Sequence, residues 1–273
     1  MSWIITGTQK NSFTPADITT ALWLDGSDNS TIFSDAGVTP ATNGSSVYQW
    51  NDKSGNGRNV TQTTLGNRPA FTTNSLNGKS AITFADNSRW MLGAAGDESA
   101  FDYTSELYFF CVCQISASGS NVITNKGRLT YNNNGWYVDI NNTNQALIGF
   151  TAPASYSSID TGSSLSLNTD IIISFEANNA TVRSRLNGVT KSTTVVNKAS
   201  WAATTNNQTL SIGAYQTSGS ATNFEGIMRQ IIIMSSVPSL TDIQKLEGWA
   251  AHHYGLTANL PIDHPYKTAV PVP

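Results

Sequence analysis

The fold of this chain is decided by the apolar run Gly226-Ile-Met-Arg-Gln-Ile-Ile-Ile-Met234 and by the amphipathic segment that follows it. The run is short, rich in β-branched residues and bounded by turn formers, which is typical of a buried strand. The next segment begins at Ser239, an N-cap residue, and ends before Gly255, which favours the left-handed conformation that stops a helix. Its apolar residues recur at three- and four-residue steps: Leu240, Ile243, Leu246, Ala250 and Tyr254. The sequence therefore predicts a late strand followed by one packed helix over residues 239–254.

The rest of the chain predicts strands joined by turns. The runs Leu107–Ile115 and Asp170–Phe175 are typical of central strands. Asn187-Gly188 separates two alternating segments and favours a tight type I′ hairpin. No alternation of helices with strands is present, and no repeat or shift in composition marks a second domain. We therefore predict an all-β, antiparallel β-sandwich with one C-terminal helix.

The chain divides into three predicted parts. Residues 1–20 are expected to form an N-terminal arm or a first edge strand. Residues 21–255 are expected to form the sandwich, including the helix. Residues 256–273 are expected to form an extended tail, because Pro261 and Pro265 interrupt regular structure there.

The composition argues against two classes of partner. Charged residues make up 12% of the chain, and its net charge of −3 comes without a basic run that would suit nucleic acid. No stretch approaches the ~18 apolar residues of a membrane-spanning helix. The segment Met1–Thr6 lacks the pattern of a secretory signal, so we expect folding in a cytoplasm. Cys111 and Cys113 are then expected to be reduced and buried on one face of a strand.

Several stretches spread over residues 16–267 share the pattern of a known family. They are Leu22–Asp28, Trp50–Gly57, Leu76–Lys79, Arg185–Val189, Leu246–Trp249 and Tyr254–Pro261. Together they resemble the laminin-G-like jelly roll of the concanavalin A-like lectin/glucanase superfamily. The resemblance implies the same sandwich for nearly the whole chain.

The resemblance also implies a role, because stand-alone chains of this kind are often bacteriophage structural proteins or surface-attached bacterial proteins. We therefore expect a non-enzymatic virion protein, such as a capsid decoration or another outer component, assembled in the host cytoplasm. Its expected partners are other virion proteins, either the major capsid protein or copies of itself. The alternative is a lectin-like adhesion module that binds a host surface glycan.

The sequence lacks the residue patterns of several classes of enzyme, including the hydrolases that share this fold. Glycoside hydrolysis needs two carboxyl groups about 5–9.5 Å apart. The hydrolases of the superfamily carry theirs on one strand as Glu-x-Asp-x-x-Glu, and this chain has no such run. The Gly-x-Ser-x-Gly pattern of serine hydrolases and the His-Glu-x-x-His pattern of zinc proteases are absent as well.

Two sets of residues remain as candidate sites. Asp25 and Asp28 flank a turn and Asp52 follows Trp50, so these carboxylates could hold Ca²⁺ or could instead accept backbone hydrogen bonds that fix the turns. We expect no other cofactor. Aromatic residues in or near loops rich in Asn and Ser could bind a sugar or could pack internally. The glycan-binding candidates are Trp136, Tyr137, Tyr156, Trp201 and Tyr215.

Overall fold

The computed structural model describes residues 12–86, 88–127, 135–152, 155–178, 180–195, 206–215 and 223–273. One sheet, sheet A, contains β1 Leu22–Asp25, β5 Ala70–Leu76, β6 Lys79–Phe84, β8 Leu107–Ile115, β13 Asp170–Ala177, β14 Thr181–Leu186, β15 Val189–Val195 and β17 Gly226–Met234. The other, sheet B, contains β2 Ile32–Phe33, β3 Gln49–Trp50, β4 Val60–Thr61, β7 Met91–Gly93, β9 Asn121–Lys126, β10 Gly135–Ile140, β11 Ala146–Ala152, β12 Ser155–Asp160 and β16 Leu210–Ile212.

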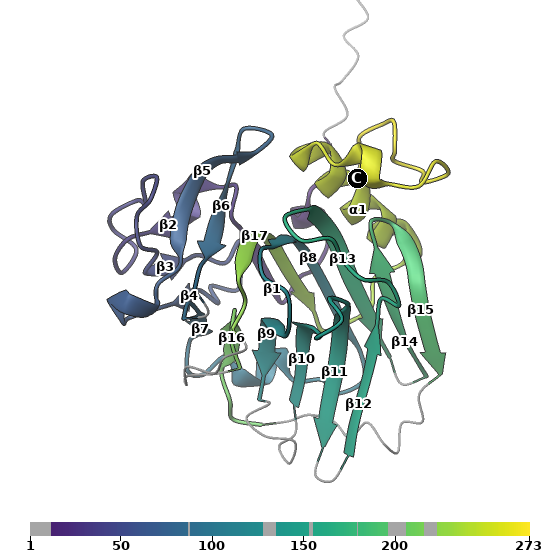
Figure 1. Ribbon diagram of the computed structural model, residues 1–273, viewed down its shortest axis with the longest axis horizontal. Coiled ribbons are helices and arrows are strands. Elements are labelled where there is room, and N and C mark those ends of the chain that lie inside the picture. The colour runs from purple at the N-terminus through teal and green to yellow at the C-terminus, as the bar shows by residue number, and fades with distance from the viewer. Residues whose placement is uncertain are drawn as a thin grey trace, which may run out of the picture.

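The two sheets pack face to face as an antiparallel sandwich, which confirms the predicted fold class (Figure 1). The strand order is β15-β14-β13-β8-β17-β6-β5 in sheet A, with β1 beside β17, and β12-β11-β10-β9-β16-β7-β4-β3-β2 in sheet B. The α-helix α1 spans Leu240–Tyr254. Short 3₁₀ turns lie at η1 Pro15–Asp17, η2 Asn29–Thr31, η3 Leu65–Asn67, η4 Glu98–Phe101 and η6 Thr257–Asn259. Among the residues that the structure describes, no helix is both long and apolar enough to span a bilayer.

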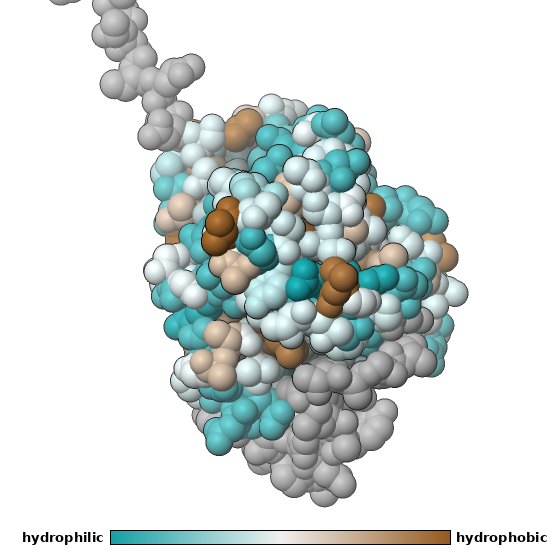
Figure 2. All heavy atoms as spheres, turned by 90° about the vertical axis from the view of Figure 1, so that its left-hand side faces the viewer, coloured by the Kyte–Doolittle hydropathy of each residue, from teal (hydrophilic) through white to brown (hydrophobic). Residues whose placement is uncertain are grey.

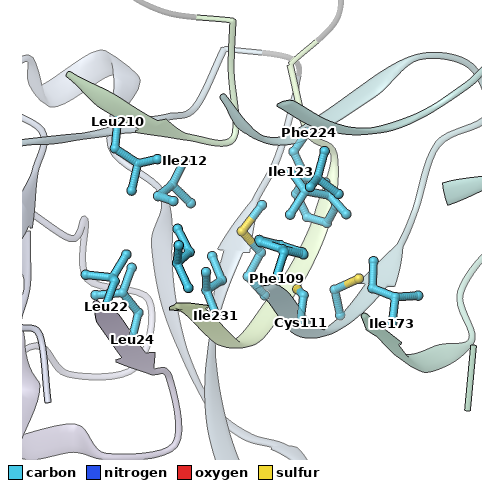
Figure 3. Close-up of a cluster of buried hydrophobic side chains, with 14 of the residues drawn as sticks. Leu22, Leu24, Phe109, Cys111, Ile123, Ile173, Leu210, Ile212, Phe224 and Ile231 are labelled. Atoms are coloured by element: carbon cyan, nitrogen blue, oxygen red, sulfur yellow. The ribbon is translucent and has the colours of Figure 1, made fainter. Parts of the chain in front are cut away.

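Strand β8 is buried on both of its faces. Phe109, Cys111 and neighbours of the same parity face the space between the sheets, while Phe110 and Val112 face the opposite way, toward α1. Figure 3 shows the inter-sheet core, where Ile123, Leu210 and Ile212 of sheet B face Phe109, Cys111, Ile173 and Ile231 of sheet A. A strand buried on both faces needs an uninterrupted apolar run, which explains why β8 does not alternate.

Helix α1 covers the outer face of sheet A. The Ser239 hydroxyl caps it by accepting a hydrogen bond from the backbone N–H of Asp242 at 3.1 Å, and Gly255 ends it with φ of 70°. Leu240, which was predicted in the buried stripe, is 56% exposed instead. The buried stripe begins one turn later, at Ile243, and includes Glu247 as well as the expected apolar residues. The predicted helix is therefore confirmed, with a correction to its buried face.

The tail differs from the extended form expected for residues 256–273. It forms a 3₁₀ turn and further bends, and its Lys267 ammonium donates to the carbonyl oxygens of Thr257 (3.1 Å) and Leu260. The lysine thereby satisfies carbonyl groups that the proline-rich segment leaves unpaired. Near its end, the Pro271 oxygen accepts from the Phe13 N–H at 2.8 Å. The tail is therefore packed on the body beside residue 13.

The two cysteines provide a direct test of the core. Cys111 and Cys113 are both fully buried in β8, and burial raises the pKa of the Cys111 thiol well above its usual range. Since the thiolate is the reactive form, we expect slow reaction of the native protein with a thiol reagent and rapid reaction of both thiols after denaturation. The measurement is absorbance-monitored labelling with and without denaturant. Fast labelling of the native protein would contradict the placement of β8.

The surface is polar but carries few charges. Figure 2 shows the end of the molecule that contains β2 to β5, where single apolar residues are scattered among polar ones. Exposed large apolar residues such as Val38 and Leu65 are single side chains of this kind. On such a surface, hydrogen-bonding groups outnumber charged ones, in agreement with the charged share of 12%.

Candidate functional site

The structure brings Asp25 and Asp28 together around a lysine. The Lys53 ammonium lies 2.9 Å from Asp25 Oδ2 and 2.8 Å from Asp28 Oδ2. Burial opposes the charge of Lys53, but the two carboxylates raise the pKa of its ammonium. Burial likewise opposes the charge of Asp28, yet hydrogen bonds from Lys53 and Ser30 lower its pKa. An ammonium group thus occupies the position between the two carboxylates that a cation would take.

The remaining oxygens of these carboxylates fix turns. Asp25 Oδ1 accepts from the backbone N–H of Ser27 at 2.9 Å, and Asp52 Oδ1 accepts from the N–H groups of Trp23 and Ser54, each at 2.9 Å. Within the described ranges, no three His, Cys, Asp or Glu side chains gather in an arrangement that could hold a metal ion. These contacts are those of turn-fixing side chains, and calcium binding at this position stays a prediction.

The two aromatic candidates on β10, Trp136 and Tyr137, point to opposite faces of sheet B. Trp136 is fully buried in the core between the sheets, where its Nε1 donates to the Phe101 carbonyl oxygen at 2.7 Å. It therefore lacks the exposed ring face that a sugar contact needs, because strand alternation turns it inward. Alternation turns Tyr137 to the outer face of sheet B, where its side chain is nevertheless covered and only 1% exposed. The side chain of Tyr156 in β12 and the whole of Trp201 lie outside the described residues.

Two of the candidates, Tyr137 and Tyr215, meet on the outer face of sheet B. Their ring centroids lie 5.6 Å apart at an interplanar angle of 68°. Tyr137 is paired across the strands with Gly149, and a Cβ at Gly149 would lie only 2.2 Å from the tyrosine ring. The glycine therefore leaves room for the Tyr137 ring to lie against β11, and Tyr215 packs edge-on beside it.

A buried carboxylate holds Tyr215 in place. Its hydroxyl donates to Asp139 Oδ2 at 2.6 Å, and the Ser120 hydroxyl donates to the same oxygen at 2.9 Å. The other oxygen, Asp139 Oδ1, accepts from the Asn121 N–H at 2.9 Å. Asp139 is buried, whereas Tyr215 is partly exposed. The result is a fixed tyrosine with polar groups beside it.

Sequence reasoning missed Asp139, Ser120 and Gly149. A signal for Asp139 was present, because residues two apart on a strand share a face, and Asp139 lies two residues after Tyr137. Gly149 and Ser120 gave no such signal, since their closeness to the tyrosines depends on how β9, β10 and β11 pair.

The chain is similar in fold to binding domains of known structure, although neither a protein-family model nor a curated protein sequence matches it. One such structure is Domain 4 of AbnA, a GH43 extracellular arabinanase from Geobacillus stearothermophilus, in complex with arabinotriose. Its TM-score is 0.57 at 11% identity, over 84% of this chain and 98% of that one. The chain has a lectin-like β-sandwich fold.

Two toxin structures are similar to the same extent. The binding domain of Paraclostridial Mosquitocidal Protein 1 has a TM-score of 0.56 at 14% identity, over 73% of this chain and 49% of that one. A structure of botulinum neurotoxin type C, whose cell entry depends on interaction with two ganglioside molecules, has a TM-score of 0.55 at 13% identity, over 84% and 50%. This chain thus spans about half of each toxin chain.

These similarities concern the fold alone. They bear differently on the sandwich fold and on the bacteriophage origin that the sequence resemblance implied. The lectin-like sandwich is confirmed. The bacteriophage origin that the resemblance implied finds no support in these structures, which belong to toxins and to an arabinanase.

Proposed function

We propose that this chain is a non-enzymatic carbohydrate-binding module that recognises a glycan through the tyrosine site on the outer face of sheet B, formed by Tyr137, Tyr215 and Asp139. The observation that carries the proposal is the partly exposed Tyr215 ring, held by its 2.6 Å hydrogen bond to Asp139. Similarity in fold to an arabinotriose-bound domain and to a ganglioside-dependent toxin supports it. The proposal thus favours the glycan-binding alternative over the virion role.

The tyrosine site has the chemistry that a sugar requires. An aromatic ring offers a flat apolar surface for the C–H face of a sugar, and its edge-on neighbour Tyr137 keeps it from rotating. Because Tyr215 is already held at its hydroxyl, little side-chain entropy is lost on binding. The partly buried Ser120 hydroxyl adds a polar group beside the ring, and the buried Asp139 carboxylate orients the hydroxyls of both Ser120 and Tyr215.

A non-enzymatic role is supported by the ion pairs that the buried glutamates form with arginines. Glu176 lies 2.7 Å from the guanidinium of Arg183, and Glu247 lies 2.7 Å from that of Arg185. Both carboxylates are thus engaged in ion pairs with an arginine, whereas glycoside hydrolysis needs two carboxyl groups directed at the substrate. Display on a virion, with the major capsid protein or copies of the chain as partners, stays a prediction of the sequence resemblance.

Glycan-array binding of the purified chain tests the proposal. We expect saturable binding to at least one glycan class, and Tyr215→Ala should weaken it roughly tenfold, which corresponds to about 1.4 kcal/mol. Tyr215→Phe, which keeps the ring and loses only the hydroxyl bond, should weaken binding less.

The matched control is Tyr48→Ala, which removes a partly buried tyrosine that packs under Arg68 instead. It should leave glycan binding unchanged. Absence of binding to every glycan class, or equal binding by the Tyr215→Ala and Tyr48→Ala variants, would overturn the proposal.

A further inference from the structure

A hollow of about 240 Å³ lies beside α1, between residues close to the first and last described positions of the chain. Ser12, Trp249, His252, His253 and Val270 line it. Its volume is roughly eight times the ~30 Å³ that one water occupies in the liquid, which is the scale of a single sugar ring. Since α1 covers the outer face of sheet A, the hollow is separated from the tyrosine site by the whole sandwich.

One wall of the hollow is aromatic and well supported. The Trp249 indole stacks on the His253 imidazole, with centroids 5.1 Å apart and planes at 23°, and it meets the Trp23 indole edge-on at 6.4 Å. The backbone bond from Phe13 to Pro271 ties together the two segments that supply Ser12 and Val270. The hollow is therefore bounded by parts that hold one another in place.

Hydrogen bonding fixes which nitrogen of each histidine carries a proton. His252 Nε2 lies 2.9 Å from the Tyr266 carbonyl oxygen, which can only accept, so Nε2 is the donor. His253 Nε2 lies 2.9 Å from Ser27 Oγ, and the single hydroxyl proton of Ser27 is donated to Asp25 Oδ1 at 2.6 Å. Ser27 Oγ therefore accepts from His253 Nε2 as well.

Both imidazoles consequently present Nδ1 as an acceptor when they are neutral. In the described part of the chain, neither Nδ1 has a protein hydrogen-bond partner. Burial lowers the pKa of His253, with Lys79 and Lys53 acting in the same direction against Asp25, so the ring is neutral at pH 7. The C-terminal end of a helix also carries partial negative charge, which favours hydrogen-bond donors over anions as ligands.

We propose that this hollow is a second carbohydrate site, which binds one neutral sugar unit. Two hydroxyl groups of the sugar donate to Nδ1 of His252 and Nδ1 of His253, and its C–H face packs against Trp249 and Val270. Neighbouring helical residues diverge by about 100°, so the two acceptors lie on different sides of the ligand. The site does not depend on Tyr215, because it lies on the opposite outer face of the sandwich.

Glutamine substitutions test the acceptor role without removing the structural bonds. The amide nitrogen of Gln can take the place of Nε2, so His252→Gln keeps a donor for Tyr266 and His253→Gln keeps one for Ser27, while both lose the Nδ1 acceptor. Gln244→Ala, on the same helix and outside the hollow, is the matched control. Melting temperatures of all three variants should stay within a few degrees of the unsubstituted protein.

The full chain, labelled with ¹⁵N-histidine, is titrated with the methyl glycosides of glucose, galactose, mannose and arabinose. We expect a saturable shift of the Nδ1 resonances with Kd on the order of 1 mM for at least one of them. Intrinsic tryptophan fluorescence, to which Trp249 contributes, should show the same Kd, weakened at least tenfold in each Gln variant and unchanged in Gln244→Ala and Tyr215→Ala.

No saturable Nδ1 shift with any of the four glycosides up to about 100 mM would overturn the inference, as would unchanged Kd values in both Gln variants. Failure of the tyrosine site is a separate result, because it appears as equal glycan-array binding by the Tyr215→Ala and Tyr48→Ala variants, whatever the outcome of the Nδ1 titration.

Discussion

Removal of residues 237–273 is expected to leave the protein insoluble or without cooperative unfolding. These residues cover apolar side chains on the outer face of sheet A: Tyr108, Phe110, Val112, Ile172 and Ile232. The helix itself buries Ile243, Leu246 and Tyr254 against them. Each large apolar side chain contributes about 1.5–3 kcal/mol on burial, so the sum for these side chains is at least comparable to the ~5–15 kcal/mol net stability of a domain. Solubility, near-UV circular dichroism and a thermal melt are the measurements.

Two point substitutions on α1 provide the control for this truncation. Leu246→Ala, at a fully buried position, should cost about 2–5 kcal/mol. Leu240→Ala, at the exposed position, should change stability by no more than about 0.5 kcal/mol. A truncated protein that stays soluble and melts cooperatively would show that sheet A is stable without its helix.

Glu247→Ala is expected to cost about 3–5 kcal/mol of unfolding free energy, because it leaves a buried guanidinium without its partner. Arg185 Nε and Nη2 lie 2.7 and 3.0 Å from the two oxygens of Glu247, with side-chain exposures of 6% and 1% for the arginine and the glutamate. Burial alone would lower the pKa of Arg185, but the carboxylate raises it. His264 Nε2, 3.3 Å from the same carboxylate, joins the tail to this pair. Urea unfolding measures the loss.

The double variant Arg185→Met with Glu247→Leu should recover most of that loss, since apolar residues of similar volume can replace a buried ion pair. Asp86→Asn removes the charge of an exposed pair with Arg89 while keeping a side chain that tolerates the φ of 60° at this position, and it should cost at most about 1 kcal/mol. If Glu247→Ala costs no more than Asp86→Asn, the Arg185–Glu247 pair does not hold α1 to sheet A.

The elements that the sequence predicts best are those with a local signal. The type I′ hairpin at Asn187-Gly188 is confirmed by φ values of 50° and 81°, because that turn needs two residues in the left-handed region. The apolar runs of β8 and β17 and the caps of α1 are local signals in the same sense. Each depends on residues within one element, so no knowledge of the partner strand is needed.

The candidate site was only partly predictable, because its contacts join distant segments. Strand alternation shows that Trp136 and Tyr137 point in opposite directions, but the packing of sheet B on sheet A decides which of them is buried in the core. Asp139 on β10 accepts a hydrogen bond from Tyr215, which lies just after the end of another strand, β16. Glu247 on α1 pairs with Arg185, which lies 62 residues earlier in the chain, on β14. No local sequence pattern predicts contacts between segments so far apart.

The pairing of β1 and β8 with β17 has a consequence for synthesis on the ribosome. Both early strands have β17 as a neighbour, and α1 follows β17, so their apolar residues emerge long before the segments that cover them. At roughly 5–20 residues per second, the nascent chain spends many seconds with Phe109, Phe110 and Leu24 uncovered. The sandwich can close only after most of the chain has left the exit tunnel. Until then, the apolar side chains of the incomplete sheets are open to aggregation and to binding by chaperones.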